Sequence, residues 1–338
     1  MNVRTYLDRY LPLLENELKE ALASPHDALS LYYGMMQYHM GWLDEQLGPS
    51  QAPQGKRLRP VLCLLTCEAV GGPIECALPA ATAIELLHNF SLIHDDIQDD
   101  SATRRHRTTV WKLWGLPHGI NSGDGMFALS FLTLGRLQER GVPTQIVLSA
   151  QRIFTETCLA LTEGQYLDMT FETQTNVDID DYLWMVRNKT AALIACSTHL
   201  GALLGGADAE IVAAYAHFGE NLGMAFQVID DILGIWGQEQ RTGKSTSSDI
   251  LTRKKTLPVV YALSDSELQA LYAKDVLADS DVAHAIAILE QNNARAFAEQ
   301  MAYEYAQQAI SYLERAGQDT LARQAIADLA QSLLQRTS

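Results

Sequence analysis

The sequence predicts an all-α fold, a bundle of many helices around a central cavity. Apolar residues recur at helical spacing over most of the 338-residue chain, and the alternating apolar and polar runs typical of strands are nearly absent. No internal repeat and no low-complexity linker interrupts this pattern. We therefore expect residues 1–338 to form a single domain whose helices pack around one core.

Loops and prolines divide the expected helices. The first two helices are predicted near residues 6–18 and 26–43, and a loop rich in Gly and Pro follows at 48–55. Pro60 stands at the start of the next helix, Gly71-Gly72-Pro73 ends it, and Pro79 is predicted to open the helix that carries His88. Further helices are predicted over residues 109–116, 121–140, 144–172, 178–205 and 209–236. A polar loop is predicted at 237–255, and helices resume at Leu257 and continue through the C-terminal third.

The chain is acidic, with a formal net charge of -16, and its apolar fraction is 47%. The apolar fraction indicates a globular protein with a large core, and the negative charge disfavours binding to nucleic acids and to anionic membranes. Five cysteines without a C-x-x-C pair indicate buried thiols in a reducing compartment. Charges near the N-terminus disfavour a signal peptide, and no apolar run is predicted to span a membrane. We expect a soluble cytoplasmic protein without stable membrane insertion.

The stretch 88–107 carries the strongest chemical signal. Four carboxylates stand together at the end of an apolar helical run: Asp95, Asp96, Asp99 and Asp100. Residues i and i+4 share a helix face, so Asp95 and Asp99 point the same way, and His88 lies on nearly the same face. Such close carboxylates repel unless a cation lies between them, and Mg²⁺ accepts a few carboxylates plus substrate phosphates. Because Arg104 and Arg105 suit phosphate oxygens, we predict a Mg²⁺-diphosphate site; the alternative is a solvated acidic helix end.

A second pair of aspartates, Asp230-Asp231, follows the apolar helical run 226–229. Carboxylates on facing helices of a bundle can hold more than one metal ion, and the helix dipole disfavours paired aspartates near a C-terminus unless they have a function. Basic residues recur at predicted turns: Lys56, Arg57, Arg59, Arg104, Arg105, Lys189, Lys244 and Lys254. In so acidic a chain they indicate phosphate binding, although any single one could form a surface ion pair instead.

These motifs, in this order, resemble the trans-isoprenyl diphosphate synthase (polyprenyl synthetase) family over most of the chain. The resemblance rests on Gly55-Lys56-Arg57-Leu58-Arg59-Pro60, Asp95-Asp96-Ile97-Gln98-Asp99, Gly164-Gln165 with Asp168, Lys189-Thr190 with Gln227, Asp230-Asp231, and Lys244 and Asp249 with Lys254-Lys255-Thr256-Leu257-Pro258. It implies the isoprenoid synthase fold, an all-α bundle around a substrate cavity.

The resemblance also implies a role for each matching residue. The residues that would bind isopentenyl diphosphate are Gly55, Lys56, Arg59, His88 and Arg105. The Mg²⁺ ligands would be Asp95, Asp99 and Asp230, with three ions per active site. The other catalytic residues would bind the allylic diphosphate or line its site. They are Asp96, Arg104, Lys189, Thr190, Gln227, Lys244 and Lys254.

One position departs from the family pattern. The second acidic motif is usually D-D-x-x-D, and its last position here is Gly234. Trp236-Gly237-Gln238 supplies no replacement carboxylate. We expect activity to survive with Asp230 as the direct metal ligand, while Asp249 could support it from beyond the direct ligands.

The implied reaction joins isopentenyl diphosphate head to tail to an allylic diphosphate, which is dimethylallyl, geranyl or farnesyl diphosphate. Its product is a short-chain, all-trans prenyl diphosphate. Phe90 precedes Asp95 by five residues, where the family places the floor of the pocket, and no insertion interrupts the motif. An aromatic residue there resembles the geranylgeranyl type, so we favour C20 over C15; the alternative is that Phe90 is ordinary core and that Leu87 and Ile84 limit the length.

Two other functions stay open at this point. A terpene cyclase is also all-α and uses D-D-x-x-D with Mg²⁺, but it needs no second diphosphate site such as Lys56, Arg59 and His88. A non-catalytic partner subunit of a prenyl synthase would explain Gly234, although every basic position of the family is present. The resemblance also implies a homodimer.

Overall fold

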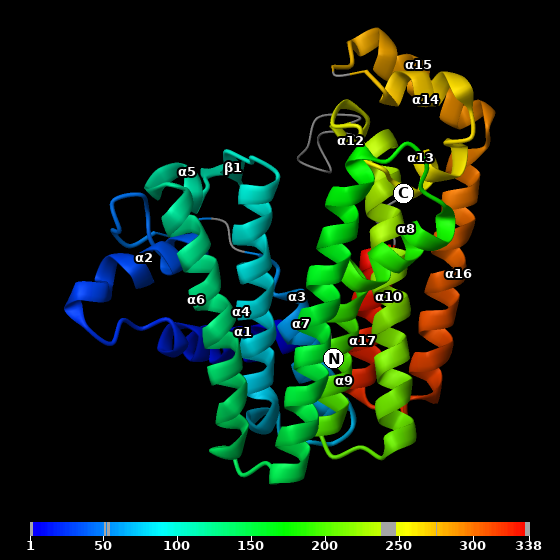
Figure 1. The fold of residues 1–338 in the computed structure, drawn as a ribbon. Coiled ribbons are helices and arrows are strands. Elements are labelled where there is room, and N and C mark those ends of the chain that lie inside the picture. The colour runs from blue at the N-terminus through cyan, green and yellow to red at the C-terminus, as the bar shows by residue number, and fades with distance from the viewer. Residues whose placement is uncertain (1–2, 51, 53–54, 238–247, 275, 335–338) are drawn as a thin grey trace. The chain divides into compact units, whose positions relative to one another are not determined.

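The computed structural model describes residues 3–50, 52, 55–237, 248–274 and 276–334 (Figure 1). Within these residues the regular structure is helical apart from a short hairpin, β1 (Thr103–Arg104) and β2 (Arg107–Thr108), and an isolated bridge between Leu43 and Pro49. The all-α prediction is therefore confirmed.

Contacts divide the chain into two compact units. Unit 1 comprises Met1–Phe154, Ser197–Ala209 and Gln318–Ala325, and unit 2 comprises Thr155–Cys196, Glu210–Gly317 and Ile326–Ser338. The expectation of a single domain over residues 1–338 stays a prediction.

Unit 1 is built around the long helix α4 (Ile74–Gln98). The elements around it are α1 (Val3–Ala21), η1 (Asp27–Leu29), α2 (Ser30–His39), α3 (Leu58–Ala69), α5 (Val110–Trp114), α6 (Leu116–Gly135), η2 (Arg136–Gln138) and the first part of α7 (Thr144–Thr173). α4 packs most extensively against α6, which runs beside it, and also contacts α3 and α1 (Figure 1). A helix with apolar residues on all faces must be surrounded by other helices, and α4 is such a helix.

One expectation about α4 is wrong. Pro79 does not open the helix, because α4 begins at Ile74 and Pro79 lies inside it. The ring of Pro79 leaves only one carbonyl without its helical donor, a small loss in a helix held by tertiary contacts. α4 is also long and apolar enough to cross a membrane, but 72% of its apolar window is buried inside the protein. It is a core helix.

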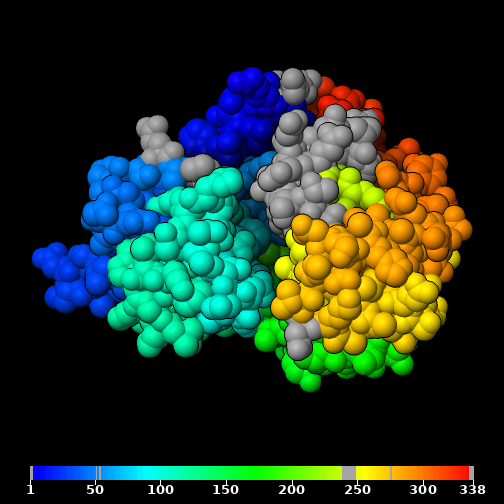
Figure 2. Space-filling model, turned by 90° about the horizontal axis from the view of Figure 1, so that it is seen from above, coloured from blue at the N-terminus to red at the C-terminus, as the bar shows by residue number. Residues whose placement is uncertain are grey.

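Unit 2 contains the rest of the helices. They are the second part of α7, α8 (Ile179–Val186), the π-helical turn η3 (Arg187–Ala191), α9 (Ala192–Leu204), α10 (Ala209–Trp236), α12 (Ser248–Leu251), α13 (Leu257–Ala262), α14 (Ser266–Tyr272), α15 (Asp279–Gln291), α16 (Ala294–Arg315) and α17 (Leu321–Leu334), with parts of α9 and α17 belonging to unit 1. One core joins side chains of α7, α8, α10, α13 and α16, and a second lies under α14 and α15. The outer faces of α14 and α15 lie at the surface in Figure 2, in yellow and orange.

The helix predicted over residues 178–205 is divided in two. α8 passes into α9 through the π-helical turn η3, which adds an extra residue to the helical path. Such single π-helical turns are rare inside α-helices and are frequently found at functional sites. η3 contains Lys189 and Thr190, which were predicted to be catalytic.

Candidate active site

The four carboxylates of the first acidic cluster differ in how far they are buried. α4 ends at Gln98, so Asp95 lies in its last turn, and Asp99 and Asp100 follow the helix. Asp96 is buried, and its Oδ1 accepts a hydrogen bond of 2.7 Å from Arg104 Nε. Burial raises the pKa of Asp96 to about 6, while Arg104 acts in the opposite direction. Asp96 therefore positions Arg104, whereas Asp95 is half-buried and Asp99 is exposed.

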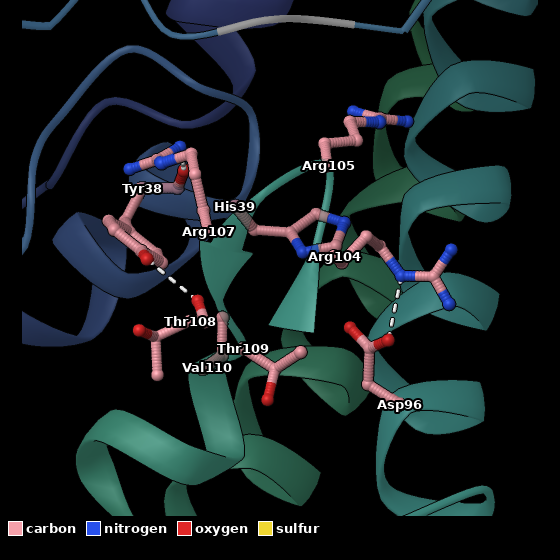
Figure 3. A pocket seen from close by; sticks show the side chains of 9 residues that line it. All are labelled: Tyr38, His39, Asp96, Arg104, Arg105, Arg107, Thr108, Thr109 and Val110. Atoms are coloured by element: carbon pink, nitrogen blue, oxygen red, sulfur yellow. Dashed lines mark hydrogen bonds and ion pairs between the residues drawn. The ribbon is translucent and has the colours of Figure 1, made fainter. Parts of the chain in front are cut away.

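The hairpin β1–β2 presents the two arginines that follow the cluster. Arg105 and His106 form its turn with φ of 51° and 62°, the left-handed region that usually requires Gly or Asn. Each such residue costs roughly 1–2 kcal/mol, and strain of this kind is common at functional sites. Arg107 anchors the hairpin because its guanidinium donates to the Tyr38 carbonyl at 2.8 Å and to the Leu43 carbonyl at 2.6 Å. Arg104 points toward Asp96 and Arg105 points away from it (Figure 3).

The residues predicted to bind isopentenyl diphosphate lie together in unit 1. A Cβ placed on Gly55 would lie 2.9 Å from Arg105 Nη2, so Gly55 leaves room for this guanidinium. Arg59 Nη1 lies 3.4 Å from His88 Nε2. Burial holds the pKa of His88 well below its usual range, and the nearby Arg59 and Arg105 act in the same direction, so His88 is a neutral imidazole. Lys56 is exposed at the start of this cluster.

Arg57 has a different environment from Lys56 and Arg59. Its guanidinium is buried and pairs with Glu85 at 2.6 Å and with Glu15 at 3.1 Å. Asn89 donates a further hydrogen bond of 2.8 Å to the Glu85 carboxylate. Because its donors are directed to these acids, Arg57 holds α3 to α1 and α4.

His39 is a site residue that the sequence did not reveal. It lines a cavity with Asp96, Arg104 and Arg105, at the end of α2 (Figure 3). Burial and the neighbouring arginines hold the pKa of His39 well below its usual range, and its Nε2 has no hydrogen-bond partner among the described residues. His39 belongs to no motif, so nothing in the sequence separates it from a core histidine.

The two aspartates of the second acidic motif also differ in how far they are buried. Asp231 is buried, and its carboxylate accepts hydrogen bonds from Tyr182 Oη, from the Leu257 amide at 3.0 Å and from Gln227 Nε2 at 3.0 Å. Burial raises the pKa of Asp231 to about 6, while these donors and Lys254 act in the opposite direction. Asp231 thus ties α10 to α8 and α13, and Asp230, which is half-buried, has a different environment.

The π-helical turn η3 lies between two glycines. A Cβ on Gly164 of α7 would lie 2.7 Å from the Lys189 Cα, and one on Gly223 of α10 would lie 2.5 Å from the Ala191 Cα. The turn directs Lys189 to an ion pair with Asp168 and Thr190 to Gln227, whose Oε1 accepts from Thr190 Oγ1 at 2.8 Å. These side chains line one cavity with Asp231 and Lys254.

Substitution of Gly164 by Ala should disturb this turn. The added methyl group meets backbone atoms that cannot rotate away, so we expect Gly164→Ala to lose about 1–3 kcal/mol of unfolding free energy and to displace Lys189. Urea denaturation measures the loss. The matched control is Gly135→Ala at the end of α6, where a Cβ meets no atom within 4 Å. Equal stability of the two variants would contradict the assigned role of Gly164.

The neighbouring lysines 254 and 255 have separate environments. Burial works against the charge of Lys254, but the carboxylates of Asp231, Asp249 and other nearby aspartates outweigh it and raise its pKa. Lys255 packs its ammonium 4.9 Å from the centre of the Tyr272 ring. Only Lys254 therefore faces the acidic residues. Lys244, also predicted to be catalytic, lies outside the described residues.

The donor chemistry of both units suits Mg²⁺. Among the described residues no three His, Cys, Asp or Glu side chains form a ready-made metal cage. Mg²⁺ needs none, because it is usually bound by one or two carboxylates and completes its octahedral shell with water and substrate phosphates. Asp95 and Asp99 in unit 1 and Asp230 in unit 2 offer such hard oxygen donors.

Comparison with known proteins identifies the family. The polyprenyl synthetase family profile matches residues 41–289. Geranylgeranyl diphosphate synthase of Mycobacterium tuberculosis is 39% identical over 302 residues, which are 88% of this chain and 84% of that protein. (2E,6E)-farnesyl diphosphate synthase of Mycobacterium bovis is 37% identical over 311 residues, 89% of this chain and 85% of that protein.

A solved structure agrees with these sequence matches. The crystal structure of a polyprenyl synthetase from Streptomyces coelicolor superposes with a TM-score of 0.88 at 35% identity, and covers 98% of this chain and 100% of that chain. The chain therefore belongs to the polyprenyl synthetase family of prenyltransferases.

Proposed function

We propose that this chain is a short-chain isoprenyl diphosphate synthase, which condenses isopentenyl diphosphate with dimethylallyl, geranyl or farnesyl diphosphate. The observation that carries the proposal is the cluster of Gly55, Arg59, His88 and Arg105 in unit 1. Such a cationic cluster suits a second diphosphate, which a terpene cyclase does not bind. The family and the named relatives support the same chemistry.

Each group of residues has a proposed task. Lys56, Arg59, His88 and Arg105 bind isopentenyl diphosphate, and the neutral His88 donates a hydrogen bond to it without adding charge. Arg104, Lys189 and Lys254 bind the allylic diphosphate, and Lys244 has the same proposed task. Asp95, Asp99 and Asp230 hold Mg²⁺, proposed as three ions. When bound, Mg²⁺ supplies positive charge that stabilises the diphosphate as it leaves.

The allylic group becomes positively charged when the diphosphate leaves, and the residues around it should stabilise that charge. Gln227 is held in one orientation because its Nε2 donates to Asp231 and its Oε1 accepts from Thr190. The carbonyl oxygen of Gln227 and the hydroxyl oxygen of Thr190 therefore stay fixed while positive charge develops on the allylic group. Because they are already in place, they need not reorganise during the reaction. The double bond of isopentenyl diphosphate then attacks, and the released diphosphate can accept the proton that is lost.

We further propose that elongation ends at C20 in preference to C15. Phe90 packs against Phe127 with ring centroids 4.9 Å apart and the ring planes tilted by 48°, and the row continues through Phe131 to Phe154 with separations of 5.1 and 5.2 Å. A row of rings on α4, α6 and α7 is a rigid apolar barrier, and it supports Phe90 as the floor of the hydrocarbon pocket.

Truncation of Phe90 tests this floor. We expect Phe90→Ala to make longer prenyl diphosphates than the unaltered chain makes, because the growing hydrocarbon chain can enter the space that the ring occupied. Products are sized by mass spectrometry after incubation with farnesyl and isopentenyl diphosphates. The control is Leu92→Ala, a half-buried neighbour outside the aromatic row. An unchanged product length in Phe90→Ala would assign the floor to deeper residues such as Leu87 and Ile84.

Release of inorganic diphosphate distinguishes the proposed function from its alternatives. A short-chain synthase of either product length releases diphosphate from geranyl diphosphate only when isopentenyl diphosphate and Mg²⁺ are both present. A terpene cyclase releases it from the allylic substrate alone, and a non-catalytic partner subunit releases none. The first pattern is expected, and either of the others would overturn the proposal.

The family resemblance supports a cytoplasmic homodimer with one domain per chain, and we propose this state. Light scattering of the purified protein in solution should give twice the mass of 37.4 kDa.

A further inference from the structure

The polar side chains around the cavity of unit 2 form one continuous chain of hydrogen bonds. Tyr182 Oη and the Leu257 amide both donate to Oδ2 of Asp231, the amide over 3.0 Å. Asp231 Oδ1 accepts from Gln227 Nε2 at 3.0 Å, and Gln227 Oε1 accepts from Thr190 Oγ1 at 2.8 Å. Tyr182 and Asp231 are buried, whereas Thr190 is half-buried. The hydrogen bonds therefore run from the core of unit 2 to the turn η3.

The chemistry of each group fixes the direction of these hydrogen bonds. Tyr182, the Leu257 amide and Gln227 all direct donors at Asp231, which is therefore a carboxylate ion with no hydrogen to donate. The Gln227 amide must turn its NH₂ group to Asp231, so its carbonyl oxygen faces Thr190 and takes the single hydrogen of that hydroxyl group. The Thr190 oxygen is left with only lone pairs for a molecule in the cavity that it lines. Its partial negative charge suits an allylic group on which positive charge develops.

We propose that Tyr182 and Asp231 are positioning residues for prenyl transfer, which set this direction so that Thr190 presents its oxygen, and not its hydrogen, to the allylic group. The inference rests on the proposed function. Tyr182 and the Leu257 amide occupy one oxygen of Asp231, so the other oxygen is directed to Gln227. Apolar side chains of α8 line the same cavity, and a fixed dipole acts more strongly in such surroundings than in water.

Asp231→Asn should reverse the direction without changing the shape of the side chain. The two donors at Oδ2 require an acceptor, so the new carbonyl oxygen takes that position and the new NH₂ group faces Gln227. The Gln227 amide then turns over and donates to Thr190, whose hydrogen turns into the cavity.

We expect Asp231→Asn to lower kcat by about 10²-fold, the loss that follows when one group directed at developing charge is removed. KM for geranyl diphosphate should change little, because the bound substrate does not yet carry this charge. Asp180→Asn, at an exposed position of α8, is the matched control and should keep the kcat of the unaltered chain.

Thr190→Val separates the direction of the hydrogen bonds from the lost charge of Asp231. No hydroxyl remains to be reversed in that background, so Asp231→Asn should lower kcat by at most about 10-fold there. Gln227→Glu added to Asp231→Asn keeps the net charge and returns an acceptor to Thr190, so kcat should rise above that of Asp231→Asn alone. Equal losses in the two backgrounds would overturn the proposal, as would a double variant no faster than Asp231→Asn.

Binding of a cationic analogue tests the same direction without turnover. One probe is a geranyl diphosphate analogue with a protonated nitrogen in place of C3, and the other is geranyl thiolodiphosphate, whose hydrocarbon carries no charge. In calorimetry with Mg²⁺, Asp231→Asn and Thr190→Val should each weaken binding of the cationic probe more than binding of the neutral one. Thr190→Val leaves Asp231 unaltered, so it decides the question even where Asp231→Asn does not fold.

Equal binding of the cationic probe by Thr190→Val and the unaltered chain would overturn the proposal. If the unaltered chain elongates but these variants do not behave as expected, only this inference fails. If the unaltered chain neither elongates nor binds the cationic probe more tightly than the neutral one, the proposed function fails with it.

Discussion

Asp95→Asn should lower kcat for prenyl transfer by about 10²–10³, the range found when one group that stabilises transition-state charge is removed. Asparagine keeps the shape of the side chain but loses the charge that would hold Mg²⁺ at the end of α4. Because Asp95 lies at the negative end of the helix dipole, the variant should be at least as stable as the original chain. Steady-state kinetics with Mg²⁺ and urea denaturation measure the two effects.

Asp100→Asn is the matched control for this prediction. Asp100 lies one residue beyond Asp99, is exposed, and has φ of 48°, a conformation that asparagine adopts as readily as aspartate. The control should keep kcat within a small factor of the original. An equal loss of kcat in both variants would mean that general acidity of the loop, and not Asp95, supports the reaction.

Arg57→Met should destabilise the protein by about 3–5 kcal/mol, the cost of removing one partner from a buried ion pair. Glu85 would keep a buried carboxylate with only Asn89 as a hydrogen-bond partner among the contacts described for it. Chemical denaturation measures this loss. Lys56→Met, at the adjacent but exposed position, should change the stability by less than about 0.5 kcal/mol.

The double variant Arg57→Met with Glu85→Leu separates the ion pair from the packing of Arg57. Replacement of both charges by apolar side chains is often close to neutral, so a large part of the lost stability should return. If Arg57→Met alone is as stable as Lys56→Met, the buried pair does not hold α3 to α4.

Much of the fold could be predicted because its pattern is local. Helical spacing of apolar residues and breaks such as Gly71-Gly72-Pro73 depend only on nearby residues, and they placed most helices correctly. The start of α4 was missed because packing against α6 and α3 outweighs the preference of Pro79 for a first turn. The turn η3 was missed because glycines distant in sequence, Gly164 and Gly223, enclose it.

The sequence predicts the candidate site as a set of residues, and only the family resemblance assigns a task to each of them. Sequence spacing cannot distinguish Asp95 from Asp96 or Asp230 from Asp231, since each pair is adjacent and identical in type. Burial in the structure distinguishes them. Asp96 is buried and bonded to Arg104, and Asp231 is buried and bonded to Tyr182 and to the Leu257 amide. The same holds for Gly234 and Asp249, which are distant in sequence and adjacent in the structure.

The most direct test of prenyl transfer is product sizing. The purified chain is incubated with isopentenyl diphosphate, Mg²⁺ and, in turn, dimethylallyl, geranyl or farnesyl diphosphate, and the products are sized by mass spectrometry. We predict a discrete prenyl diphosphate that ends at C20 with every primer. A discrete C15 product would retain the synthase and correct the floor at Phe90. No elongation with any primer, by protein shown to be folded, would contradict the assignment as a prenyl diphosphate synthase.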